Sequence, residues 1–502
     1  MDTVHERRSD ASLRMKYVIR GNIVLDSPLI IGAGPVAAEE ELDQRILRTA
    51  EKKYPLIPGT ALAGVLRSIL NAQRVSATDW KNNKEDVAVR HIFGDIDGSD
   101  AAQSALEIAD IVLQKRTGQL AKRDGVAIDP YTGAGIEGRK YDYEILDRDG
   151  KTTASGGQAE LILTVRDGMD SDEAETAAKW LTDTLRGGIS IGAMTAKGFG
   201  RVSFPDACYV VYDFGKPEAA GAWMDYLGRA YGWIDIADWK EDAKKKGLAC
   251  YNAKKATSLP VGMLKITLHA KLRTSLLVRK GEMDVTDGDK KIQRHLKSLD
   301  DYVIPGTSVK GVLRSHGGYI LRSLLPTDKA EELLQGLMGF AKSDQPSSKG
   351  AIKSRFVVDE VYISPNEVNA KEQNRTRIDR FTGGTIDRAL FKEEPLWQKG
   401  EETPVHLSFS IEHCAKWEAG FALLLLRDIW LGDVAFGGDV SVGRGTLQGV
   451  RADIQYRQGE DEPVKWTVTN NGQDVDGDRE ALESFVTSDF KDMIRASGGE
   501  MS

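Results

Sequence analysis

The chain has 502 residues, of which 41% are hydrophobic and 29% charged. At roughly 150 residues per domain, this length excludes one small fold and predicts two or three domains. No run approaches the ~20 apolar residues that cross a bilayer, and no secretory signal opens the chain, so we expect a cytoplasmic protein. Cys208, Cys250 and Cys414 lie too far apart to indicate disulfides or a zinc site, so we expect no zinc.

The net charge of −8 is unevenly distributed. Residues 458–502 hold 11 acidic and 4 basic residues, a net of −7, so the preceding 457 residues carry only −1. By contrast, residues 271–297 hold 8 basic and 4 acidic residues, and residues 371–392 hold 6 and 3. Such stretches can follow a phosphate backbone, although without a further pattern a solvated surface of mixed charge explains them equally well.

In chain order, the first predicted element is a strand, KYVIRGNIVL, over 16–25. The segment IPGTALAGVLRS, over 57–68, predicts a helix whose first amides Thr60 caps. A second helix over 171–187 leads directly into a glycine-rich loop, AKGFGRV, over 196–202. Strands and amphipathic helices therefore alternate along this half of the chain.

The same elements return in the second half. A strand, MLKITLHAKL, begins at Met263, and IPGTSVKGVLRS, over 304–315, matches the first helix start at 9 of 12 positions, with Thr307 as its cap. AIDPYTGAGI pairs with RIDRFTGGTI, and AKGFGRV pairs with SVGRGTL. Matches in the same order, 245–250 residues apart, indicate a duplicated domain, whose copies we call the first and second repeat.

The order of elements predicts an α+β fold made of two tandem ferredoxin-like or RRM-like modules. Long segments between the helices, such as 133–157, fit hairpin insertions better than core. We expect a first module over 15–203, a Trp-rich helical connector over 204–262, a second module over 263–455 and a mobile acidic tail over 456–502.

One motif favours a different class of protein. Gly32–Ala37 has the form GxGxxA after a strand, which could hold a dinucleotide over a helix N-terminus. No acidic residue ends a second strand ~20 residues on, no alternating βαβ series follows, and the second repeat lacks these glycines. A dinucleotide-binding enzyme is therefore the less favoured alternative.

Two features of the repeats suit a phosphate. The Pro-Gly-Thr helix start offers amides and a hydroxyl near a basic residue inside the helix, which is Arg67 in the first repeat and Lys310 or Arg314 in the second. A capped helix with surface arginines explains one copy equally well, but duplication of the arginine favours a ligand. The cations beside the paired glycines of the two loops are Lys197, Arg201 and Arg444.

Together these motifs resemble the RAMP superfamily of CRISPR-Cas proteins, and more narrowly the backbone subunit of type III effector complexes, fused in tandem. The resemblance covers about Met15–Ser203 and Met263–Ile454. It implies that each module has a palm that holds guide RNA and a hairpin thumb that wedges between bases. It also implies that a loop between the first strand and the first helix carries an aspartate that cleaves the target RNA.

Carried onto this chain, the resemblance assigns the cleaving acid to Asp43 of DQRILR and to Asp289 of DKKIQR, which align as D-x-x-I-x-R. Asp287 and Asp284 are substitutes for Asp289, and an exposed surface acid is the alternative for Asp43, which ends an EEELD run. The repeats also differ at two positions. Ala63 of the first repeat corresponds to Lys310 of the second, and Pro130 of the first corresponds to Arg380 of the second.

An aspartate in such a loop could remove the proton of the 2′-hydroxyl or hold a hydrated Mg²⁺ or Mn²⁺, leaving a cyclic phosphate. The metal ligands would be Asp43 and Asp289, and His295 could assist in the second repeat. The expected partners are a CRISPR guide RNA, complementary target RNA and other Cas subunits, without a membrane. A non-catalytic guide-RNA scaffold is the alternative to this endoribonuclease. The expected RNA-binding residues are Thr60, Arg67, Thr132, Lys197, Arg201, Thr307, Lys310, Arg314, Arg377, Arg380, Thr382 and Arg444.

Overall fold

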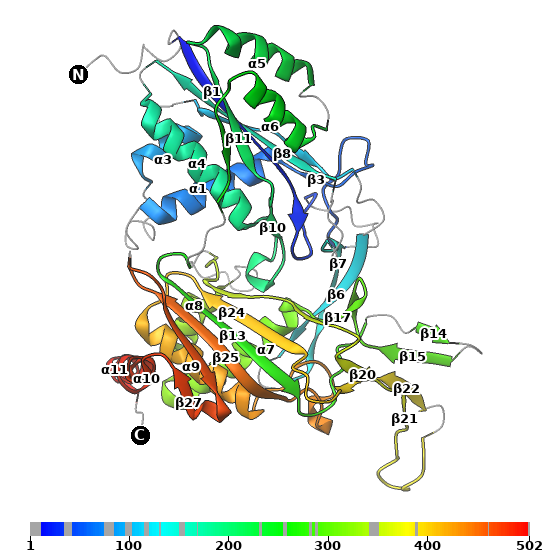
Figure 1. Ribbon diagram of the computed structural model, residues 1–502. Helices are drawn as coiled ribbons and strands as arrows, with labels where there is room; N and C mark the ends of the chain where they lie inside the picture. Colours follow the sequence, from blue (N-terminus) through cyan, green and yellow to red (C-terminus); the bar gives the residue numbers. More distant parts are fainter. Residues whose placement is uncertain are drawn as a thin grey trace. The chain divides into compact units, whose positions relative to one another are not determined.

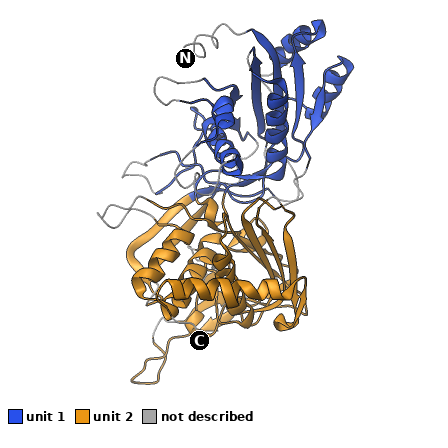
Figure 2. Ribbon diagram, turned by 90° about the vertical axis from the view of Figure 1, so that its left-hand side faces the viewer, with its two compact units in different colours: residues 1–121, 144–193, 200–257 blue, residues 122–143, 194–199, 258–502 orange. Residues whose placement is uncertain are grey.

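Two compact units make up the chain (Figure 2). Unit 1 consists of residues 1–121, 144–193 and 200–257, and unit 2 of residues 122–143, 194–199 and 258–502. Each unit contains most of one repeat, but 122–143 and 194–199, although part of the first repeat in sequence, belong to unit 2. The computed structural model describes residues 12–34, 43–74, 85–95, 103–114, 120–129, 132–149, 156–167, 169–229, 233–254, 259–280, 284–286, 290–340, 351–386, 390–459 and 461–499, with the backbone alone for 284–286, 290 and 291.

The first repeat folds into an antiparallel sheet with the strand order β12-β11-β1-β8-β4 (Figure 1). Without the edge strand β12, this is the order 4-1-3-2 of a ferredoxin-like module, as the sequence predicts. The strands are β1 (Leu13–Asn22), β4 (Leu106–Ile108), β8 (Gln158–Arg166), β11 (Cys208–Asp213) and β12 (Cys250–Asn252). The helices between them are α1 (Gly59–Arg74), α3 (Val87–Phe93) and α4 (Ser171–Gly187).

Both faces of this sheet are covered. Tyr17 and Ile19 of β1 point into the core shared with α1 and α4, whereas Val18, between them, packs against α5 (Pro217–Arg229) and α6 (Ile236–Lys245). Successive strand residues face opposite sides, so a strand buried on both faces is apolar throughout. In the structure β11, α5, α6 and β12 also pack on this sheet, beyond the predicted end of the first module at residue 203.

The second repeat forms a sheet with the order β18-β24-β13-β25-β26-β27. In β13, alternate residues are buried and only partly buried, so one face packs against the helices and the other is polar. The strands are β13 (Met263–Leu272), β18 (Phe356–Val358), β24 (Val405–Ile411), β25 (Leu447–Arg457), β26 (Val464–Thr469) and β27 (Asp474–Asp476). The helices are α7 (Gly306–Leu324), α8 (Thr327–Met338) and α9 (Lys416–Leu431).

The acidic segment after 455 is folded, which corrects the prediction of a mobile tail. Its strands β26 and β27 extend the sheet, and Phe485, Phe490 and Ile494 are buried in the core against α9. These apolar residues recur at helical spacing and form the buried side of the helices, whereas the described acidic residues of the segment lie in its turns, in β27 and on the exposed side of the helices. The helical elements are α10 (Arg479–Ser484), the π-helical turn η6 (Phe485–Phe490) and α11 (Lys491–Ala496).

A hairpin is inserted between the second and third sheet strands of each repeat. In the first repeat it is formed by β6 (Leu120–Ile128) and β7 (Gly135–Leu146), and in the second by β21 (Gln373–Arg375) and β22 (Phe391–Glu394). Figure 1 shows the second hairpin reaching away from the sheet of unit 2. These insertions correspond to the predicted thumbs, although the first begins earlier than the predicted 133–157.

Short elements connect these parts. In the first repeat they are β2 (Val24–Leu25), β3 (Leu56–Ile57), β5 (Ile111–Val112), β9 (Ile189–Ser190), η2 (Thr195–Lys197) and β10 (Arg201–Ser203). In the second they are β14 (Asp284–Thr286), β15 (Lys290–Arg294), β16 (Lys297–Ser298), β17 (Asp301–Ile304), β19 (Val361–Ile363), β20 (Val368–Ala370), β23 (Leu396–Gln398), η4 (Val440–Val442) and η5 (Asn470–Gly472). In the part of the chain that the structure describes, no helix is long and apolar enough to cross a membrane.

Candidate nucleic-acid interface

The D-x-x-I-x-R motif is anchored in the same way in both repeats. Arg48 Nη2 lies 2.6 Å from Glu144 Oε1 in the first repeat, and Arg294 Nε lies 2.9 Å from Glu394 Oε2 in the second. Both glutamates lie on the returning strand of the thumb hairpin, β7 or β22. Each arginine therefore fixes the motif to the base of its thumb.

Backbone contacts and burial support the same alignment. The amide of Ile46 donates to Glu144 Oε2 at 3.1 Å, and the Ile46 side chain is buried, as is that of Ile292, the isoleucine of the second motif. In the second repeat the motif runs parallel to β22, with Arg294 opposite Glu394. The sequence alignment of DQRILR with DKKIQR is thus matched by equivalent packing.

The candidate acids themselves are only partly described. Asp43 is exposed, three residues before the buried Ile46. Asp289 and Asp287 lie outside the described residues, and for Asp284, at the start of β14, only the backbone is described. Among the described residues no group of three or more His, Cys, Asp or Glu side chains is arranged to hold a metal ion. Catalysis and metal binding by these acids therefore stay predictions.

The thumb tips share one turn. Asp129 Oδ1 accepts the amide of Thr132 at 2.9 Å, and Asp379 Oδ1 accepts that of Thr382 at 2.8 Å. In the second repeat the amides of Thr382 and Phe381 and the Thr382 hydroxyl lower the pKa of Asp379. The same motif therefore forms the same aspartate-centred turn twice.

The second thumb tip presents an aromatic ring close in sequence to two cations. Phe381 is 97% exposed, and Arg377 and Arg380 beside it are also exposed. An exposed aromatic ring next to guanidinium groups suits stacking on a base with phosphates nearby. Tyr131 and Pro130, the corresponding residues of the first thumb, lie outside the described residues.

The Pro-Gly-Thr helix starts differ from the prediction. α1 begins at Gly59 and α7 at Gly306, so Thr60 and Thr307 lie inside the first turn and are not caps. The Gly59 amide donates to the Asp110 carboxylate at 2.7 Å. Because an acid occupies this helix start, a phosphate would meet a negative charge there.

The basic residues of these helices make structural contacts. Arg67 pairs with Glu85 through two 2.6 Å contacts, and Arg314 donates to the Gly339 carbonyl at 2.8 Å. Both contacts hold the main helix against the next one, so packing explains why the arginine is repeated. RNA binding by Arg67 and Arg314 stays a prediction, but the argument from duplication fails.

Lys310 is buried and faces neutral acceptors. Its Nζ donates to Ser354 Oγ at 2.6 Å and to the carbonyls of Phe356 at 2.8 Å and Ala196 at 3.3 Å. Burial, together with the nearby charges of Lys197 and Arg314, lowers its pKa to about 7. Lys310 therefore joins elements of unit 2 rather than presenting a charge at the surface, and RNA binding by Lys310 stays a prediction.

The two glycine-rich loops have the same backbone. Met194 and Asp439 both take the left-handed conformation at φ +59°, each is followed by a 3₁₀ turn, η2 or η4, and each turn ends at a left-handed glycine, Gly198 or Gly443. Lys197 is half-buried, which lowers its pKa, whereas Arg201 is exposed. Of the three predicted loop cations, Arg201 is thus the one that lies at the surface.

Arg444 belongs to a charged cluster that the sequence analysis missed. Its Nη1 lies 2.9 Å from Glu393 and 3.1 Å from Asp439, and Arg279 and Arg375 contact the same two acids at 2.8–3.1 Å. Burial alone would raise the pKa of Glu393, but the three guanidinium groups outweigh it and lower that pKa. The cluster joins the thumb base to the second glycine-rich loop and carries one excess positive charge.

His295 does not serve the proposed chemistry. It is buried, accepts the Val278 amide through Nδ1 at 3.1 Å, and contacts the Val303 carbonyl through Nε2 at 3.2 Å. Burial lowers its pKa to about 4, so it is neutral at physiological pH. The expectation that His295 assists catalysis is wrong, because both ring nitrogens are used inside the core.

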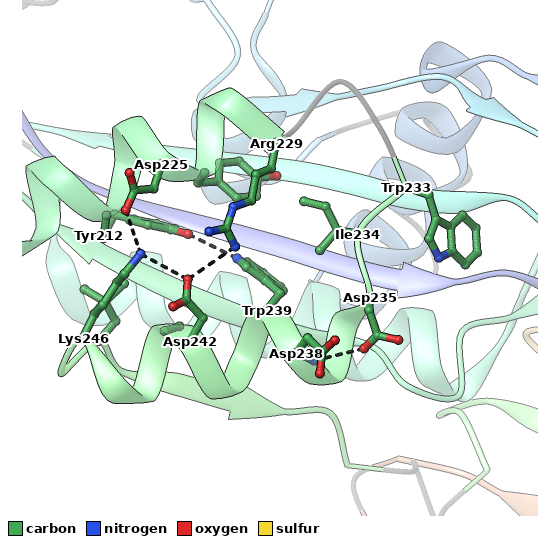
Figure 3. Close-up of a pocket in the computed structure, with 14 residues that line it drawn as sticks. Tyr212, Asp225, Arg229, Trp233, Ile234, Asp235, Asp238, Trp239, Asp242 and Lys246 are labelled. Atoms are coloured by element: carbon green, nitrogen blue, oxygen red, sulfur yellow. Dashed lines mark hydrogen bonds and ion pairs between the residues drawn. The ribbon is translucent and has the colours of Figure 1, made fainter.

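A cavity of about 260 Å³ opens between α5 and α6 in unit 1 (Figure 3). Trp239 in its wall is buried, whereas Trp233 at its edge is 54% exposed. Its charged lining groups number four carboxylates against two cations, which disfavours a polyanion. The charged residues are Asp225, Arg229, Asp235, Asp238, Asp242 and Lys246. We therefore do not place RNA in this cavity.

The chain matches the model of a known protein family over most of its length. The model of the RAMP superfamily matches residues 22–203 and 269–448, well over half of the chain and one stretch per repeat. The chain belongs to the RAMP superfamily. Each ferredoxin-like sheet of this RAMP protein is antiparallel, whereas a dinucleotide-binding unit needs a parallel one. Of the Gly32–Ala37 motif, residues 35–37 lie outside the described residues.

Part of this RAMP protein is also similar to a curated protein, the CRISPR system Cms endoribonuclease Csm3 of Mycobacterium tuberculosis. The two are 33% identical over 84 residues, which make up 16% of this chain and 36% of that relative. The chain thus matches about a third of the relative's length. The fold and family predicted from the duplicated motifs are confirmed.

Proposed function

We propose that this RAMP protein is a guide-RNA-binding backbone subunit of a type III CRISPR effector complex that cleaves complementary RNA, with one loop aspartate per repeat. The observation that carries this proposal is the duplicated anchor, Arg48 to Glu144 and Arg294 to Glu394. It ties each D-x-x-I-x-R motif to the base of a thumb hairpin. The name of the Mycobacterium tuberculosis relative, an endoribonuclease, supports the same activity.

In the proposed reaction, RNA supplies its own nucleophile. The 2′-oxygen attacks the adjacent phosphorus, the bond to the 5′-oxygen breaks, and a 2′,3′-cyclic phosphate and a 5′-hydroxyl result. In-line alignment of these atoms requires a kinked backbone. Asp43 or Asp289 would take the 2′-hydroxyl proton or orient a hydrated Mg²⁺ or Mn²⁺, which would stabilise the charge on the phosphorane.

The thumbs would supply the kink. Phe381, at the end of an aspartate-centred turn, can insert between two bases because its ring is almost fully exposed. Arg377 and Arg380 precede it on the same exposed turn and can contact nearby phosphates. A base displaced by this ring would leave its ribose exposed to the loop that Arg294 anchors in the second repeat.

A non-catalytic scaffold is the second candidate function. The exposed position of Asp43, which is also typical of an ordinary surface acid, favours it. In that case the loops would only shape the path of the RNA, and the thumbs would still separate the bases. The two candidates differ in one respect, the effect of replacing the acid without changing its size.

The deciding experiment uses complementary RNA, end-labelled, with the complex assembled on its guide RNA and Mg²⁺ or Mn²⁺. We expect cuts at two or more regularly spaced positions. Asp43→Asn and Asp289→Asn should each remove a different subset of cuts, and Glu51→Gln, an exposed acid just beyond the first motif, should remove none. Asp284→Asn and Asp287→Asn test the substitutes. An unchanged ladder in all acid variants, with guide binding retained, would support the scaffold.

A further inference from the structure

Two segments of the first repeat are built into unit 2. They are residues 122–143 of the first thumb and residues 194–199 of the first glycine-rich loop. Arg123 Nη1 lies 2.5 Å from Glu360 Oε1, and the exposed fractions of these side chains are only 4% and 0%. Lys310 Nζ contacts the Ala196 carbonyl of the loop. We call the residues that receive these segments, the start of α7 and the turn between β18 and β19, the receiving surface.

The backbone fit at the receiving surface is close. A Cβ atom added to Gly306, the first residue of α7, would lie 1.8 Å from the Lys197 carbonyl oxygen. One added to Gly198 would lie 2.7 Å from the Glu360 amide nitrogen. Both glycines are therefore required because the two backbones touch, and not only for their conformational freedom.

The other glycine-rich loop has the same shape and, among the described residues, no such neighbour. η4 repeats the conformation of η2, but a Cβ on Gly443 would meet nothing within 4 Å. Val440 and Val442, the first and last residues of this turn, are 48% and 57% exposed. Unit 2 thus presents a second loop of the docking type with its contact side open.

The receiving surface of the first repeat is also open. Asp110, in the turn between β4 and β5, takes the place of Glu360, and it is exposed, as are Ala109 and Thr60 around it. The Glu360 side chain, by contrast, is fully buried by the docked segment. The described part of the chain therefore shows a filled junction, an open loop and an open receiving surface.

A second copy of this chain could not reproduce the filled junction with its open ends. Lys310 is replaced by Ala63, which has no amine to bind the loop carbonyl. Arg123, six residues before the thumb aspartate, is replaced by Gln373, whose Oε1 already accepts from Arg444 at 2.9 Å. Finally, Asp110 Oδ1 accepts the Gly59 amide.

We propose that the open loop Val440–Val442 docks on a RAMP module of a different chain and rejects a second copy of this one. The partner's receiving surface would carry a glycine at its helix start, apolar side chains against Val440 and Val442, and a carboxylate near the exposed part of Arg279. This proposal depends on the proposed function in one respect, which is that the chain assembles beside other RAMP modules. It requires no RNA cleavage.

The first test is the sedimentation of the purified full chain over a range of concentrations, with and without guide RNA. One monomeric species is expected throughout. Concentration-dependent oligomers that Val442→Asp abolishes would overturn the proposal. The triple variant Ala63→Lys, Asp110→Glu and Gln373→Arg should self-associate, because it restores the three missing contacts. A triple variant that stays monomeric would overturn the assignment of specificity to these positions.

The second test is co-expression with the other RAMP subunits of the complex. Val442→Asp should reduce recovery of the neighbour at this end about tenfold or more, because a charge would enter an apolar contact. Val464→Asp, at a similarly exposed valine on β26, is the matched control and should have no effect. Normal assembly with Val442→Asp would overturn the proposal. A chain that assembles in this way but does not cleave RNA would refute only the proposed catalysis.

Discussion

Arg123 and Glu360 form an ion pair that is almost completely buried, 237 residues apart in the sequence. Tyr362 donates a further hydrogen bond to Glu360 Oε2 at 2.9 Å. Removing one partner of such a pair leaves a buried charge without its counterion, whereas replacing both by apolar groups costs much less. The stability of unit 2 therefore depends on a contact made by a segment of the first repeat.

We expect Arg123→Met to lower the free energy of unfolding by about 3–5 kcal/mol. The double variant Arg123→Met with Glu360→Leu should recover most of this loss, since no unpaired charge remains. Urea unfolding followed by tryptophan fluorescence measures both. Arg451→Met, at an exposed arginine of β25, is the control and should change the unfolding free energy by less than about 1 kcal/mol. Equal losses in the single and double variants would contradict the role of charge.

Lys310 predicts a pH dependence of stability. Its pKa is lowered to about 7 in the folded protein and returns to about 10.4 on unfolding. Between these values the unfolded chain binds more protons, so stability rises with pH, by at most about 1.4 kcal/mol per pH unit from this group. Lys310→Met should remove this rise between pH 7 and 9. Lys329→Met, at an exposed lysine of α8, should leave it unchanged.

Gly198 and Gly443 offer a matched pair of substitutions. Both are left-handed, so alanine at either position costs about 1 kcal/mol in backbone strain. At Gly198 the methyl group also collides with the Glu360 amide, whereas at Gly443 it meets open space. Gly198→Ala should therefore destabilise the chain by several kcal/mol more than Gly443→Ala in thermal unfolding. Equal effects would mean that the loop contact is not maintained in solution.

The repeated motifs are sufficient to predict the fold because each one marks a relation between local elements that both modules share. The strand before the loop, the helix after Pro-Gly-Thr and the turn around Asp129 or Asp379 all form from residues close in sequence. The structure confirms them as two sheets with the same strand order. The acidic tail was misjudged because net composition conceals the spacing of Phe485, Phe490 and Ile494.

The roles of the basic residues cannot be predicted from local repeated motifs. A basic residue beside a helix start looks the same in sequence whether it binds phosphate or a neighbouring carbonyl. Arg67 finds its partner 18 residues away, and Lys310 finds one 114 residues away. The cluster around Glu393 likewise joins residues from four separate segments. Such contacts depend on tertiary packing, which no local motif records.

Phe381 predicts the effect of the second thumb on RNA. Stacking of one base on an aromatic ring is worth about 1–3 kcal/mol, so Phe381→Ala should weaken binding of the guide about 5- to 150-fold. Phe381→Trp should restore it, because stacking needs only a flat ring. Filter binding at fixed ionic strength measures the change. Leu390→Ala, at an exposed apolar residue that follows the same turn, should have little effect, and a loss as large as that of Phe381→Ala would indicate a general apolar contact.

The duplicated anchors predict separable losses of cleavage. Arg48→Met should release the loop that carries Asp43 from Glu144, and Arg294→Met should release the second loop from Glu394. Because the anchor positions the acid and does not itself react, each variant should slow its own subset of cuts about 100-fold, as expected for misplacement by about 1 Å. Glu144→Gln should show a similar but smaller loss, since one hydrogen bond can remain.

Two readouts distinguish this positioning role from general destabilisation. Guide binding and the free energy of unfolding should change little, because both ion pairs are partly exposed and such pairs contribute about 1 kcal/mol or less. Arg45→Met, in the same loop but exposed, is the matched control and should leave the ladder intact. If Arg48→Met slowed every cut equally, or if Arg294→Met altered the cuts assigned to Asp43, the anchors would not act on separate sites, and one acid per repeat would be excluded.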